Sequence, residues 1–138
     1  MRRLLLFITF IVLVSAGSAA SAPDPTLAEG LRATLTNGID AGLRTWYANR
    51  PWLAQEMREK LLLATRGLGD VIDTEIVAVQ PVSKRVTRYY VAIYFTRCPL
   101  WLRVERYAGQ EQAFYLPLRF STNPDEILPG YITEFYQQ

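Results

Sequence analysis

The 138-residue chain contains no histidine. Without histidine it cannot form the Ser-His-Asp or Cys-His arrangements of many hydrolases, and it lacks a common acid–base group and a common zinc ligand. A glycine-rich phosphate loop is missing too, because Gly67-Leu68-Gly69 lacks the rest of that pattern. We therefore predict no catalytic residue set of these kinds, no metal site and no cofactor.

Cysteine is nearly absent as well. Cys98 is the only one, so the chain cannot form an intramolecular disulfide. Two interpretations of Cys98 are open: a small residue of a turn, or a thiol beside Arg97 that pairs between chains. We favour the turn. The core must then stabilise the fold without a covalent crosslink, which is feasible at this length.

Residues 1–20 have the pattern of a signal peptide. Arg2 and Arg3 precede an apolar run from Leu4 to Val14, and small residues follow. The run is about half of the roughly 20 residues that a membrane span needs. We predict cleavage before Ser21 and export to the periplasm or the medium, with residues 21–138 as one domain. The alternative is an uncleaved anchor.

Without residues 1–20, the chain has no excess of either positive or negative charge. The chain has 15 basic and 13 acidic residues, and two of the basic ones are Arg2 and Arg3, which leaves 13 (15 − 2) of each sign. A neutral domain gives no electrostatic reason to bind nucleic acid or an anionic membrane. We expect neither as a partner after cleavage.

Helices are expected first. From Pro25 to Asn49 apolar residues recur in steps of three and four, which predicts a helix with one buried face: Leu27, Leu31, Leu35, Ile39, Leu43 and Trp46. Asp24 is the expected cap, and Asn37-Gly38 is expected to bend or break the helix. A second helix is predicted from Pro51 to Arg66, with Leu53, Met57, Leu61 and Ala64 buried.

Strands follow the helices. Residues 71–79, 85–96, 100–107 and 113–121 are rich in β-branched and aromatic residues and alternate with period two. Pro117 indicates an edge or a bulge in the last of them. The order predicts an α+β fold, with N-terminal helices on one face of a curved antiparallel sheet of about four strands.

This arrangement resembles the cystatin-like cone of the nuclear transport factor 2-like superfamily, and in particular its small secreted bacterial domains of unknown function. The segments that carry the resemblance are Gly67–Glu75, Tyr90–Phe95, Trp101–Tyr107 and Phe114–Asp125. They cover most of residues 21–138, but they describe strands and turns rather than chemistry. The resemblance implies a cone that often leaves a cavity between sheet and helices, and sheets that often pair into homodimers.

A register can be predicted for the central hairpin. With Cys98-Pro99 as the turn, Phe95 faces Leu102 and Ile93 faces Val104, which gives an apolar inner face beneath the helices. A three-residue loop at 108–110 would then place Phe114 and Leu116 on that inner face and Tyr115 on the outer one.

The outer face of this hairpin is amphipathic. It is either a solvated sheet face or a contact surface, most simply for a homodimer, because Tyr, Trp and Arg are enriched at interface hot spots. The interface candidates are Tyr90, Tyr94, Trp101, Arg103, Glu105, Tyr107 and Tyr115.

A pocket for a small apolar ligand is the second candidate site. Its predicted residues are Trp46, Tyr47, Trp52, Tyr89 and Arg106, and they describe an ordinary core equally well. We favour an exported, non-catalytic binding or interaction module. One alternative is a small cavity enzyme of the isomerase or dehydratase type, for which Asp40 with a tyrosine is the only candidate. The other is an inhibitor-like partner of another envelope protein.

Overall fold

The computed structural model describes residues 24–136, with side chains through Thr133. The predicted signal peptide and its cleavage before Ser21 lie outside these residues. Three helices come first, α1 (Pro25–Asn37), α2 (Ile39–Trp46) and α3 (Pro51–Thr65). An open antiparallel sheet follows, so the predicted α+β class is confirmed.

The helix break occurs where it was predicted. Gly38 separates α1 from α2 with φ 88°, a left-handed backbone conformation that glycine adopts without steric cost. Asp24 stands at the N-cap position of α1 as predicted, but its carboxylate makes no cap hydrogen bond and instead accepts one from Tyr115.

The predicted buried face of the first helix is wrong at one position. Leu35 is 44% exposed, and Thr34 is buried in its place. The reason is close packing of α1 on α2. A Cβ at Gly42 would overlap the Thr34 hydroxyl, which itself donates a hydrogen bond to the Gly30 carbonyl at 2.8 Å. Gly30 and Thr34 of α1 face α2, so Leu35 lies on the solvent side.

The sheet has five strands in the described part of the chain: β1 (Val71–Pro81), β2 (Val86–Phe95), β3 (Pro99–Ala108), β4 (Ala113–Tyr115) and β5 (Arg119–Ser121). β1, β2 and β3 are neighbours in order, and β4 and β5 both pair with β3. The last predicted strand is therefore two short strands. They flank Pro117, which has no N–H for the ladder.

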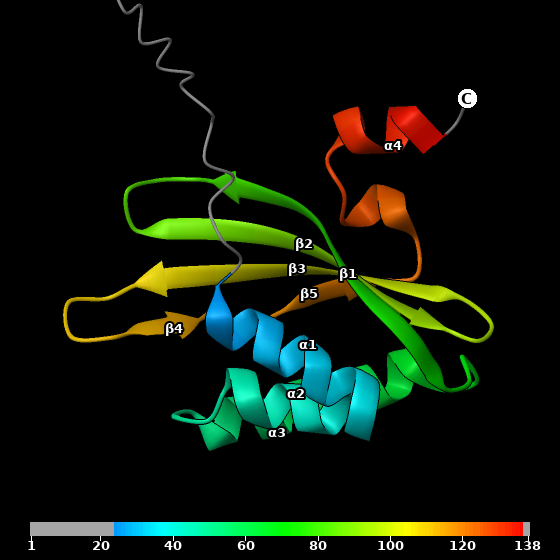
Figure 1. Cartoon of the computed structure of the whole chain (residues 1–138), viewed down its shortest axis with the longest axis horizontal. Helices are drawn as coiled ribbons and strands as arrows, with labels where there is room; N and C mark the ends of the chain where they lie inside the picture. Colours follow the sequence, from blue (N-terminus) through cyan, green and yellow to red (C-terminus); the bar gives the residue numbers. More distant parts are fainter. Residues whose placement is uncertain (1–23, 137–138) are drawn as a thin grey trace, which may run out of the picture.

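The helices cover one face of the curved sheet, and the C-terminal segment lies on the other (Figure 1). The inner face carries the main core. Ile93 and Val104 are both fully buried in a cluster with residues of α1, α2 and α3, so the predicted inner side of the hairpin is confirmed. On the outer side, the 3₁₀ helix η1 (Pro124–Glu126) and α4 (Gly130–Tyr136) follow β5. Ile127 and Leu128 between them pack on Tyr90.

The predicted hairpin partners are wrong, although the faces are right. Ile93 lies opposite Leu100, four positions from the predicted Val104. The turn is formed by Thr96 and Arg97, whose N–H groups donate to Asp70 O and Leu68 O, both at 3.0 Å. The segment between α3 and β1 thus holds the turn in place. A shift by an even number leaves every side chain on its predicted face.

The predicted register of β4 is also wrong, and here the faces change. Ala108 pairs with Ala113, so the loop is residues 109–112 rather than 108–110. This odd shift of three positions turns the strand over. Tyr115 consequently lies beside Arg106 on the inner face, and Phe114 lies beside Tyr107.

Candidate functional site

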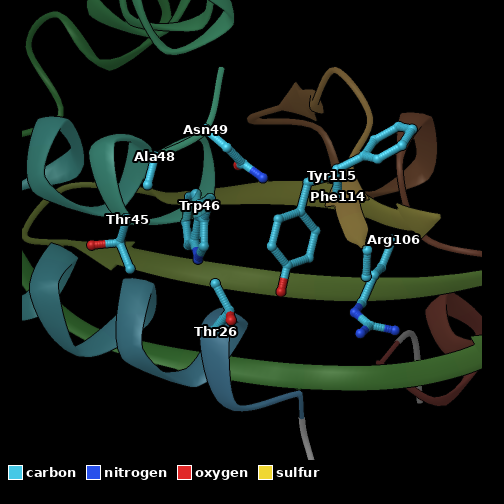
Figure 2. A pocket seen from close by; sticks show the side chains of 9 residues that line it. Thr26, Thr45, Trp46, Ala48, Asn49, Arg106, Phe114 and Tyr115 are labelled. Atoms are coloured by element: carbon cyan, nitrogen blue, oxygen red, sulfur yellow. The ribbon is translucent and has the colours of Figure 1, made fainter. Parts of the chain in front are cut away.

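A pocket of about 480 Å³ opens to solvent between the helix layer and the β3–β4 end of the sheet. In Figure 2 the ring of Tyr115 lies between Trp46 and Arg106, with Thr26 of α1 below. Helices α1 and α2 form one wall, and β3 and β4 form the other. The lining residues are Thr26, Thr45, Trp46, Ala48, Asn49, Arg106, Ala113, Phe114 and Tyr115.

Trp46 forms a rigid part of this lining. It is 2% exposed, and its indole Nε1 donates to the Leu27 carbonyl at 3.3 Å. The indole packs directly on Gly30, where any Cβ would overlap the ring. The absence of a side chain at Gly30 therefore allows α2 to bring Trp46 against α1.

Asp24 contacts two of the residues that line the pocket, Tyr115 and Arg106. The Tyr115 hydroxyl donates to its Oδ2, and Arg106 Nε lies 3.6 Å from its Oδ1. Arg106 donates no hydrogen bond to any residue of the described chain. The nearby Tyr89 is buried, and burial together with the negative charge of Asp24 raises its pKa.

Phe114 borders a second hollow beside the pocket. The guanidinium of Arg50 lies over its ring, with the Arg50 Cζ 3.8 Å from the ring centroid. Tyr107 packs on the same ring, with centroids 5.2 Å apart. The hollow, of about 330 Å³, is lined by Asn49, Arg50, Gly109, Gln110, Glu111, Gln112 and Phe114. Two arginines therefore stand close to this end of the sheet.

The structure brings together some of the predicted pocket residues. Trp46 and Arg106 line the pocket, and Tyr89 is buried near Arg106. Tyr47 is in the core and lines a different hollow, whereas Trp52 is 64% exposed on α3. Sequence reasoning missed Asp24, Phe114 and Tyr115. The signal for Tyr115 was present but was assigned to the outer face by the wrong loop length.

Asp40, the candidate acid, lies in a hollow of about 640 Å³ between α2 and α3. Its Oδ2 accepts from Arg58 Nε at 3.0 Å, and the two side chains are 32% and 44% exposed. The carboxylate is half-buried: its Oδ1 is buried and has no hydrogen-bond partner within the described residues, whereas Oδ2 is paired with the Arg58 cation. Tyr47, in the same hollow, donates its hydroxyl to the Leu116 carbonyl at 2.7 Å.

The predicted interface residues lie on the outer face, with the exception of Tyr115. Tyr90 is 3% exposed beneath Ile127 and Leu128, and Trp101 packs against the same cluster. Tyr94 donates to Glu75 at 2.7 Å and stands edge-on to Trp101.

The charged members of the outer face pair within the sheet. Glu105 accepts from Arg88 at 2.7 Å, and Arg103 lies 3.8 Å from the same oxygen. The hydrogen bond to Glu105 raises the pKa of Arg88 above its ordinary value. Much of this face is thus already engaged within the chain.

Cys98 was predicted as a small residue of the hairpin turn. It is partly buried and directly follows the two turn residues.

The chain matches no protein-family model, and no curated protein or solved structure is significantly similar to it. No helix among residues 24–136 has the length and apolar character to cross a bilayer. The function must accordingly be argued from the pocket and its neighbouring charges.

Proposed function

We propose that this protein is an exported, non-catalytic binding protein that holds a small ligand in the pocket between α1–α2 and β3–β4. The observation that carries the proposal is a ring-lined pocket of about 480 Å³ beside Arg106, whose guanidinium donates no hydrogen bond within the described residues. Ligand pockets are commonly about 300–1,000 Å³, with apolar walls and a few placed polar groups. Trp46, Phe114 and Tyr115 line the pocket, with Phe114 the most exposed of the three rings, and Arg106 supplies the polar group.

Export and family membership belong to this proposal. The N-terminal residues 1–20 have the pattern that secretion requires. Helices that precede an open antiparallel sheet are compatible with the cystatin-like cone of the nuclear transport factor 2-like superfamily. In that fold a cavity between helices and sheet is a natural ligand site, and the pocket lies at such a junction.

The pocket is favoured over the other candidates for physical reasons. An enzyme of the isomerase or dehydratase type would need an acid in an apolar cavity, but Asp40 forms an ion pair with Arg58. A homodimer or an inhibitor-like complex through the outer face would need a free aromatic surface. Ile127 and Leu128 of the same chain already cover Tyr90 there.

The test is to fill the pocket. Thr26 lines it and is exposed, so Thr26→Phe should occupy its mouth. Thr36→Phe is the matched control, because Thr36 is an exposed threonine in the last turn of the same helix. Indole is used as a neutral aromatic probe on the ¹⁵N-labelled full chain. It should shift the amide signals of Thr45, Asn49 and Phe114 in the wild type and in Thr36→Phe, but not in Thr26→Phe.

Two results would contradict the proposal. If indole at millimolar concentration leaves these amide signals unshifted in the wild type, the pocket binds no aromatic ring. Equal shifts in the wild type and in Thr26→Phe would place the binding elsewhere.

A further inference from the structure

Arg106 is an unusual residue for its position in the sheet. The alternation of β3 places it on the inner face with Leu102 and Val104, both fully buried. It is the point where this apolar face reaches the pocket, next to Tyr115 on β4. A guanidinium has five N–H donors in a planar fork that matches a carboxylate.

These N–H groups donate no hydrogen bond within the described chain, where the guanidinium is ion-paired with Asp24. Arg106 Nε is 3.6 Å from Asp24 Oδ1, which is longer than a hydrogen bond. The other Asp24 oxygen accepts from Tyr115. The Arg106 side chain is only 34% exposed, so its fork lies partly out of water beside aromatic rings. A carboxylate in that position would form charge-assisted, bidentate hydrogen bonds.

The charges around the pocket favour an anion. Arg106 and Arg50 are the nearby cations, and Asp24 is the nearby anion. Arg50 lies over Phe114, at the border of the pocket. Glu111 lines the adjoining hollow and is exposed, so solvent screens its charge more strongly. Arg106 is the one charged residue among those that line the pocket, so its lining favours an anion over a cation.

The walls determine the rest of the ligand. Three rings line the pocket with Arg106: Trp46 and Tyr115, which are 2% and 4% exposed, and Phe114, which is half-buried (Figure 2). We infer that the ligand is a small aromatic monocarboxylate, with its carboxylate on Arg106 and its ring along Tyr115 toward Trp46. This inference rests on the proposed function, since it names the ligand class of that same pocket.

The experiment compares two compounds of nearly the same size and shape, of which only the acid is charged. Naphthalene-2-carboxylate and naphthalene-2-carboxamide are titrated into the full chain by calorimetry at pH 7, and amide shifts of Asn49 and Phe114 report whether they bind in the pocket. We expect the acid to bind at least about tenfold more tightly than the amide. Arg106→Gln should abolish this preference. Arg103→Gln, which removes an arginine from the outer face of the same strand, should preserve it.

A second variant should raise the affinity for the acid instead of lowering it. Asp24→Asn removes the negative charge beside Arg106 while keeping an oxygen that can accept from Tyr115. The acid should bind this variant more tightly than the wild type, and the amide should not. A gain in affinity cannot be produced by a variant that merely fails to fold.

The outcomes separate the two proposals. If acid and amide both shift the pocket amides with equal affinity, or if Arg106→Gln keeps the preference, the carboxylate inference is overturned and the pocket function stands. If neither compound shifts them, the carboxylate inference is overturned, and if indole does not shift them either, the pocket function is overturned as well.

Discussion

The hydroxyl of Tyr115 in β4 donates a hydrogen bond to Oδ2 of Asp24, the residue immediately before α1. The two residues are 91 positions apart in the chain. Arg106 of β3 forms an ion pair with the same carboxylate, with its Nε 3.6 Å from Oδ1. Asp24 therefore connects the start of the helix layer to two strands, at the polar side of the pocket.

Tyr115→Phe tests this connection. The variant keeps the ring and removes the donor, so Asp24, whose side chain is 10% exposed, loses a hydrogen bond in a place that water reaches poorly. Hydrogen bonds to charged groups contribute about 1.5–3 kcal/mol, and we expect a loss of that size in the free energy of unfolding. Urea denaturation measures it. The control Tyr131→Phe changes a 55% exposed tyrosine and should stay within about 0.5 kcal/mol. Equal effects of the two variants would contradict the role of the contact.

Most of the fold follows from local patterns in the sequence. The helix break at Gly38 and the inner side of the hairpin depend on one glycine and on period-two alternation, and both were predicted correctly. The hairpin partners depend on where the turn falls. That position is set by hydrogen bonds from Thr96 and Arg97 to a distant segment, which no local pattern contains.

The pocket was only partly predictable for the same reason. Its polar group, Arg106, could be seen from strand alternation. Tyr115 could not be placed, because the loop after β3 has one residue more than expected and a single odd shift exchanges the faces of a strand. Asp24 was expected to cap a helix, which is the ordinary local role of Asp before Pro. Its pairing with Tyr115 is a tertiary contact.

Gly30→Ala tests the packing behind Trp46. Alanine favours a helix over glycine by about 1 kcal/mol, so an unobstructed site would gain stability. At Gly30 the new methyl group would overlap the Trp46 indole, and overpacking costs about 1–3 kcal/mol. We expect a net loss of stability in thermal and urea unfolding. Adding Trp46→Leu makes room for the methyl group. Alanine at position 30 should then cost less than it does in the presence of Trp46, and a full penalty in that background would show that the clash is not the cause.

Leu128→Ala tests the cover on the outer face. Leu128 is 6% exposed and packs with Ile127 on Tyr90. Truncation of a buried leucine costs about 2–5 kcal/mol, and we expect the lower end because this cluster is small. Leu63→Ala, at a 70% exposed position on α3, is the control and should stay within about 0.5 kcal/mol. Chemical denaturation measures both. A neutral Leu128→Ala would mean that the C-terminal segment contributes little to the fold.

The burial of Tyr47 should make the free energy of unfolding depend on pH in alkaline solution. It is 1% exposed, and burial raises the pKa of its hydroxyl well above the ordinary value of about 10. Above pH 10 the unfolded chain releases this proton and the folded chain retains it, so the folded state binds more protons and stability falls as pH rises. The expected slope is about 1.4 kcal/mol per pH unit for each such tyrosine, and Tyr89 adds to it in the same direction. Tyr47→Phe should lower stability at pH 7 by about 1 kcal/mol through the lost bond to Leu116, yet make it less dependent on pH above 10. Urea midpoints between pH 8 and pH 11 measure this, and an unchanged slope in Tyr47→Phe would show that another group titrates.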